Sequence, residues 1–162
     1  MNQPPDTLRD EKVRIRQEFD AGKVTQCRCC GQTVKKYRRN ITGAMAVALI
    51  LLSKKDALGD DWIHVEDFLK DMPGLPSSIR GDVAKLRHWG LIEKKPEERE
   101  DGSPRNGYYK ITNLGREFIK GEKQLPRHIF LYNNKLLGFD SEECTIKQCL
   151  GKKFDYNQLM SR

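Results

Sequence analysis

The sequence lacks a long apolar run, a hydrophobic leader and any grouping of residues that suggests catalysis. Its longest apolar stretch, Ala44–Leu52, is far shorter than the roughly 20 residues that a membrane-spanning helix needs. The amino-terminal segment is polar, so we expect no signal peptide. The three histidines lie far apart without a cysteine or carboxylate placed to activate a nucleophile, and no glycine-rich phosphate loop is present. We therefore expect a cytoplasmic protein that is neither membrane-bound nor an enzyme.

The composition is that of a folded, basic protein. The chain has 162 residues, of which 33% are charged and 37% hydrophobic, which favours one globular domain with small appendages over a disordered chain. The net charge is +7 and the isoelectric point is about 9.2, which favours an anionic partner. The alternative is a basic surface that only aids solubility.

Three of the five cysteines gather within one short segment. Cys27, Cys29 and Cys30 are nearly adjacent in a chain with no export signal, so they are thiols or metal ligands rather than a disulfide framework. Cys27 and Cys30, followed by Gly31, have the C-x-x-C-G spacing of a zinc knuckle, in which two thiolates on a tight turn grip one Zn²⁺.

A structural zinc ion has four ligands, and the sequence contains no second C-x-x-C or H-x-x-x-H pair. The missing ligands could come from a second copy of the knuckle, or from the remaining cysteines, which are Cys29, Cys144 and Cys149. A plain thiol cluster is the main alternative. A redox role of the thioredoxin type lacks the βαβ context that it needs.

The cysteine cluster lies inside a basic segment, residues 21–40. Six cations and no acid occur there: Lys23, Arg28, Lys35, Lys36, Arg38 and Arg39. Tyr37 stands between the last four, so residues 35–39 could clamp phosphates and stack on a base. A solvated basic linker is the alternative.

Three helices are expected before residue 91 in addition to an amino-terminal helix over 8–19, which could be an arm or a dimer contact. Residues 41–54 are apolar on nearly all sides and predict a buried helix. After a polar turn at 56–61, residues 64–72 predict the second helix, stopped by Pro73 and Gly74. Ser77 or Ser78 can cap the third helix.

The run over residues 77–119 is the most informative part of the chain. Ile79, Val83 and Leu86 give a helix an apolar face, and Gly90 ends it. Strands over 91–94 and 108–111 flank a charged loop, and Thr112 can cap a final helix. The order helix, strand, loop, strand, helix therefore follows from local patterns alone.

This order, with Lys85-Leu86-x-x-x-Gly90-Leu91-Ile92 and a later Tyr109-x-Ile111-Thr112-x-x-Gly115, resembles winged helix-turn-helix regulators of the MarR type. The resemblance covers residues 41–120. It implies an α+β fold that binds double-stranded DNA, as in transcription regulation. Winged helices that contact proteins are the alternative, because a fold does not fix a function.

In such a domain the third helix would enter the major groove. Arg80 is the best base reader, since its planar guanidinium can bond guanine bidentately. The other expected contacts to DNA are Ser77, Ser78, Lys85, Arg87, Lys94 and Arg105. The wing departs from the usual basic pattern, because Glu97, Glu98, Glu100 and Asp101 would repel phosphate.

Residues 122–162 form a separate tail. Asn133-Asn134, between two apolar runs over 129–132 and 135–139, predicts a tight hairpin, and short helices are expected over 144–150 and 155–160. The expected organisation is an arm at 1–20, a basic knuckle at 21–40, a winged helix at 41–121 and this tail.

A wider resemblance joins these parts. Cys27-x-Cys29-Cys30-Gly31-Gln32 with Lys36-x-x-Arg39, the winged run and Phe154-Asp155-Tyr156-x-x-Leu159-Met160 is similar to small uncharacterised proteins of tailed bacteriophages. It implies a phage-encoded protein in the host cytoplasm and, in the knuckle, zinc. The leading hypothesis is a DNA-binding regulator or a DNA-metabolism factor, which could form a homodimer. The alternative is a module that binds a host or phage protein.

Overall fold

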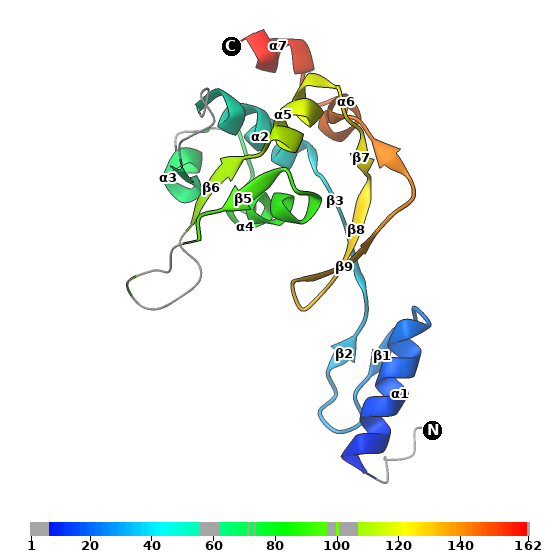
Figure 1. Ribbon diagram of the computed structural model, residues 1–162. Helices are drawn as coiled ribbons and strands as arrows, with labels where there is room; N and C mark the ends of the chain where they lie inside the picture. Colours follow the sequence, from blue (N-terminus) through cyan, green and yellow to red (C-terminus); the bar gives the residue numbers. More distant parts are fainter. Residues whose placement is uncertain are drawn as a thin grey trace. The chain divides into compact units, whose positions relative to one another are not determined.

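The computed structural model has an α+β organisation of short helices and several small sheets (Figure 1). The structure describes residues 7–55, 62–70, 72, 74–96, 100 and 107–161. They fall into two compact units. The N-terminal unit contains the described residues up to Arg39 together with Phe130–Gly138, and the main unit contains those of Asn40–Ile129 and from Phe139 onward.

Helix α2 (Gly43–Lys55) is the centre of the main unit. Met45–Ile50 are all buried, and the helix contacts α4, α5, α6 and α7. A helix that is apolar on all sides must be covered on all sides, so the predicted buried helix is confirmed. It begins at Gly43 rather than 41 because Thr42 precedes it, accepting the Met45 N–H through Oγ1 at 3.2 Å.

The elements that follow α2 alternate between helix and strand. They are β4 (Ile63–His64), α3 (Val65–Lys70), α4 (Ile79–Ala84), the 3₁₀ helix η1 (Lys85–Trp89), β5 (Ile92–Lys94), β6 (Tyr108–Ile111) and α5 (Asn113–Lys120). The strands form one antiparallel sheet in the order β4-β6-β5, and β5 and β6 are adjacent beside α4 in Figure 1. Its core-facing residues are buried: Ile63, Ile92, Tyr109 and Ile111.

Two expectations for the helices were wrong. The second helix begins at Val65 rather than His64, because His64 pairs with Tyr108 in β4. Ser78 does not cap α4 through its side chain, since its own backbone is already helical, at φ −65° and ψ −17°. The third helix also changes from α to 3₁₀ at Lys85 before Gly90, at φ 78°, ends it.

Thr112 begins α5 as predicted. Its hydroxyl accepts the Gly115 N–H at 3.0 Å and donates to the Gly90 carbonyl at 2.6 Å, so one side chain joins the end of η1 to the start of α5. Phe118 and Ile119 on α5 are buried. The cap therefore fixes where α5 lies against the sheet.

Gly115 predicts a large steric effect. A Cβ there would lie 2.3 Å from the Leu91 carbonyl oxygen and 2.7 Å from Ile111 Cγ1. Gly115→Ala is therefore expected to lower the unfolding free energy by about 1–3 kcal/mol. Denaturant titration followed by tryptophan fluorescence measures this loss. Gly81→Ala on α4, where nothing lies within 4 Å, is the control and should be neutral or stabilising. Equal losses at both sites would contradict the steric account.

The carboxyl-terminal part of the main unit packs on α2. It comprises β7 (Leu125–Pro126), β10 (Glu143–Cys144), α6 (Ile146–Leu150) and α7 (Tyr156–Ser161). The two predicted short helices are confirmed, with Gly151 between them. The first begins at Ile146 rather than at 144, because Cys144 pairs with Leu125 in a strand and Thr145 and Gln148 form a capping box.

The N-terminal unit joins a helix to small strands. The predicted first helix is confirmed as α1 (Leu8–Asp20), and β1 (Thr25–Gln26) pairs with β2 (Thr33–Val34). Most of a second sheet also belongs to this unit, and its strand order is β3 (Tyr37–Asn40), β8 (His128–Tyr132), β9 (Lys135–Phe139). Asn133 and Asn134 have φ of 52° and 60°, so the predicted tight hairpin is also confirmed.

Candidate nucleic-acid interface and cysteine sites

The beginning of α4 presents polar residues to solvent. Ser77, Ser78 and Arg80 are exposed, whereas Ile79 and Val83 are buried. This division between faces is the one that the helical spacing predicts. Arg80 and the two serines are therefore on the accessible side of the segment predicted to read DNA.

The cations of α4 have acidic neighbours. Arg80 Nη1 lies 3.2 Å from Glu66 Oε1 on α3, and Lys85 Nζ lies 2.9 Å from Asp82 Oδ1. Both side chains of the first pair are exposed, Arg80 by 54% and Glu66 by 56%, so water screens the attraction and the pair is weak. A phosphate or a guanine could displace Glu66 at little cost.

The other cations near α4 and on the strands differ in their exposure and in their partners. Arg87 on η1 and Lys94 on β5 are half-buried. Lys110, a further cation on β6, has an acidic partner, since its Nζ lies 3.2 Å from Glu93 Oε1, and it also lies 4.7 Å from the Trp62 ring centre. Arg105 and the acidic residues Glu97, Glu98 and Asp101 are outside the described residues. Their predicted roles stay predictions.

The basic segment of the N-terminal unit is more accessible. Lys36, Arg38 and Arg39 are exposed and Lys35 is half-buried, and β3, to which the last residues belong, is an edge strand. The four cations form no ion pair with any carboxylate among residues that the structure describes. They can therefore bind an anion without first releasing a carboxylate, whereas Arg80 and Lys85 must each exchange one.

Tyr37 lies among these cations with 39% of its surface exposed. Lys35 Nζ is 4.9 Å and Arg39 Cζ is 5.9 Å from the centre of its ring. Residues 35, 37 and 39 alternate along an extended chain, so they share a side. An exposed aromatic ring between two cations can stack on a base while the cations contact phosphate.

The cysteine cluster forms a tight loop between β1 and β2. The Gly31 N–H donates to the Cys27 carbonyl at 2.7 Å, and Gly31 has φ 76°. Hydrogen bonds from the backbone N–H groups of Cys30 and Cys29 lower the pKa of the Cys27 thiol. Desolvation, together with the neighbouring Cys27, raises the pKa of Cys29. The loop thus favours one thiolate, at Cys27.

Within each unit, as far as the structure describes it, four zinc ligands do not come together. Cys144 and Cys149 belong to the main unit, where their sulfurs lie 3.3 Å apart. The described residues contain one group of three potential ligands within 4.8 Å, namely His128, Asp140 and Glu142. Within this group, His128 Nδ1 and Asp140 Oδ2 form a 2.9 Å hydrogen bond, which needs no ion. Zinc at Cys27 and Cys30 stays a prediction.

A buried carboxylate supports the cysteine loop, and sequence reasoning missed it. Glu11 on α1 is only 1% exposed, and its Oε1 accepts the Arg28 N–H at 2.7 Å and Arg14 Nη2 at 2.5 Å. Arg14 also donates to Thr25 Oγ1 at 2.9 Å and to the Gln26 carbonyl at 2.7 Å. The only available signal was the three-residue spacing of Glu11 and Arg14. The ion pair therefore joins α1 to the loop.

This network makes the N-terminal unit sensitive to acid. Arg14, followed by the Arg28 N–H, lowers the pKa of Glu11 from 4.5 to about 2. Because the folded value is below the unfolded one, the carboxylate stabilises the unit above pH 4.5, and this contribution is lost as the pH falls toward 2. We expect the Arg28 amide proton resonance to titrate with a midpoint near 2 in the intact chain. A midpoint near 4.5, or an identical titration in Glu11→Gln, would contradict this assignment.

Comparison with known proteins adds no family. The chain matches no protein-family model, and no curated protein or solved structure is detectably similar to it. Within the described ranges, no helix is both long and apolar enough to cross a membrane.

Proposed function

We propose that this chain is a DNA-binding protein of the winged helix-turn-helix class, acting in the cytoplasm as a transcription regulator or an accessory factor of DNA metabolism. The order of elements in the main unit supports the class: α2, β4, α3, α4 with η1, then the β5–β6 hairpin. So does the sheet order β4-β6-β5, in which the last strand lies between the other two. The part from α4 to α5 has the order of helix, strand, loop, strand and helix on which the resemblance in the sequence rests.

One observation carries the proposal. The segment that begins α4 exposes Ser77, Ser78 and Arg80 while Ile79 and Val83 anchor it in the core. Residues at the start of a recognition helix contact base edges in a major groove. Arg80 would exchange Glu66 for guanine, and the two serine hydroxyls would bond phosphate oxygens.

The basic strand adds contacts that do not depend on sequence. Lys35, Lys36, Arg38 and Arg39 are free of carboxylate partners among the described residues, and each phosphate that they neutralise would release condensed counterions. Tyr37 could stack on an unpaired base, which suits a factor that meets locally open DNA. This part of the mechanism does not require α4.

Hydrogen–deuterium exchange with and without duplex DNA tests the proposal. Peptides covering residues 77–90 and 35–40 should gain protection, because backbone amides at an interface exchange more slowly. Peptides covering α7 provide an internal reference. Strong binding without protection at residues 77–90 would remove α4 from the interface.

A protein-binding module is the second candidate function, and strand β9 favours it. Leu136 and Leu137 are exposed on this edge strand, where an extended segment of a partner could add to the sheet. Leu8 and Val13 on α1 are also exposed, and they could form the contact between two copies of the chain in a homodimer. Sedimentation of Leu137→Lys against the unaltered chain tests self-association through β9. A monomer in both cases would exclude it.

A further inference from the structure

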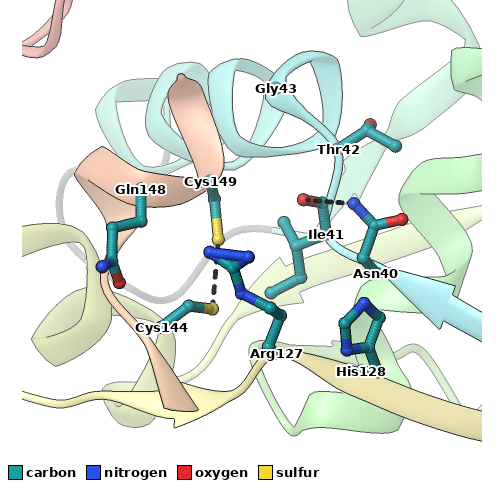
Figure 2. Close-up of a pocket in the computed structure, with 9 residues that line it drawn as sticks. All are labelled: Asn40, Ile41, Thr42, Gly43, Arg127, His128, Cys144, Gln148 and Cys149. Carbon is teal, nitrogen blue, oxygen red and sulfur yellow. Dashed lines mark hydrogen bonds between the residues drawn. The ribbon is translucent and has the colours of Figure 1, made fainter. Parts of the chain in front are cut away.

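Cys144 and Cys149 form a close pair of thiols in the main unit. Their sulfur atoms lie 3.3 Å apart, Cys144 at the end of β10 and Cys149 in α6 (Figure 2). The capping box of Thr145 and Gln148 fixes the start of the helix between them, and the Cys149 N–H donates to the Thr145 carbonyl at 3.1 Å. The backbone therefore holds the two sulfurs together within one short, ordered segment.

Cys144 and Cys149 border a small cavity whose surface is mostly polar. The cavity has a volume of about 120 Å³ and is lined by residues of the main unit: Asn40, Ile41, Thr42, Gly43, Arg127, His128, Cys144, Gln148 and Cys149. Cys149 is half-buried, and Cys144 is 1% exposed but still borders the cavity. A small oxidant can thus reach the sulfurs, whereas the surrounding chain shields them from other proteins.

Arg127 gives this cavity its charge. Its guanidinium lies beside the two sulfurs in Figure 2. The hydrogen bond with Cys149, helped by Arg127, lowers the pKa of Cys144, whereas Cys144 and burial raise the pKa of Cys149. Glu142 Oε1 lies 3.7 Å from Arg127 Nε, so the two side chains form an ion pair without a strong hydrogen bond, and the carboxylate offsets part of the positive charge. A positive charge beside a thiol favours the thiolate, which is the reactive form.

We propose that Cys144 and Cys149 are a redox-modification site, which a hydroperoxide oxidises to an intrachain disulfide. A metal is the less suitable ligand, because among the described residues no third cysteine, histidine or carboxylate joins the two sulfurs within 4.8 Å. A disulfide needs only the two sulfurs. They must approach from 3.3 Å to about 2.05 Å.

The reaction has two steps. One sulfur, as the thiolate, attacks a peroxide oxygen, so the O–O bond breaks and hydroxide leaves, giving a sulfenic acid. The second sulfur attacks the first, the S–O bond breaks, and the hydroxyl group leaves with a proton as water. The hydroxide takes up the proton lost from the first thiol. The dithiol thus loses two electrons, and hydrogen peroxide becomes two water molecules.

Peptide mapping after peroxide treatment tests the site. Trypsin cleaves after Lys135, Lys147 and Lys152, so Cys144 and Cys149 fall on separate peptides, residues 136–147 and 148–152. The folded, reduced full-length chain is treated with hydrogen peroxide, alkylated to block exchange and digested. The expected result is a disulfide joining these two peptides, in excess over singly oxidised sulfinic or sulfonic forms, and lost on treatment with a reductant.

Matched variants separate this site from the amino-terminal cysteines. A chain with Cys27→Ser, Cys29→Ser and Cys30→Ser should form the same linked peptides, and Cys149→Ser in that background should not. If the triple variant does not fold, the linkage between the two peptides in the unaltered chain still identifies the pair. Linked peptides absent under conditions that oxidise Cys29 or Cys30, or Cys144 joined mainly to another cysteine, would overturn the proposal.

Discussion

Arg80→Ala is expected to weaken binding to a preferred duplex by about 1–3 kcal/mol and to relax the preference at one base position. The loss corresponds to a roughly five- to 150-fold increase in Kd. The reason is geometric, since Arg80 is exposed at the start of α4 and its guanidinium can bond guanine through two N–H groups. Fluorescence anisotropy with a selected duplex and with point-substituted duplexes measures both effects.

Two variants make this test specific. Glu66→Gln removes the carboxylate 3.2 Å from Arg80 and should leave affinity equal or higher, because the guanidinium no longer has to exchange an ion-pair partner. Lys120→Ala, at the exposed last residue of α5, removes the same charge and should change affinity by less than Arg80→Ala. An Arg80→Ala variant that binds every duplex like the unaltered chain would show that α4 does not read bases.

Replacing Lys35, Lys36, Arg38 and Arg39 together by alanine is expected to weaken binding to all sequences alike. If each cation contacts one phosphate, the slope of log K against log salt becomes shallower by about 3 to 4. The physical basis is that these four side chains have no carboxylate partner among the described residues and lie on or beside an edge strand. Titrations at several salt concentrations give the slope directly.

The control removes equal charge from the same unit. Arg9, Lys12, Arg16 and Lys23 are also exposed, on α1 and the turn after it. Replacing these four by alanine lowers the net charge equally, so an equal loss of slope would show that only overall charge matters. An unchanged slope in the basic-strand variant would remove residues 35–39 from the interface.

The sequence predicted those caps and turns that depend on interactions between residues close together in the chain. Thr112 caps α5 because its hydroxyl reaches the Gly115 N–H, and Asn133-Asn134 forms a tight turn because asparagine tolerates positive φ. The two-residue strands β4 and β10 could not be predicted, because only pairing with distant Tyr108–Tyr109 and Leu125–Pro126 defines them. His64 and Cys144 were placed in helices for that reason.

In the candidate sites, too, the contacts between residues far apart in the chain could not be predicted from the sequence. Exposure of Ser77, Ser78 and Arg80 follows from helical periodicity, but the partner of Arg80 lies 14 residues earlier, on another helix. Glu11 bonds the backbone of Arg28, 17 residues away, and no spacing rule indicates such a contact. The approach of Cys144 and Cys149 required the strand and the capped helix to be placed together. Only the three-dimensional contacts therefore show that Arg80 has an acidic partner on another helix, whereas the cations of residues 35–39 have none among the described residues.

Selection of duplexes from a random pool, by the full-length chain at a low and a high salt concentration, tests the central claim most directly. The proposed winged-helix reader predicts salt-sensitive binding, with an enriched motif whose guanine preference disappears in Arg80→Ala. Salt-sensitive binding without enrichment would leave a non-specific factor that depends on residues 35–39. No binding even at low salt would contradict DNA binding altogether.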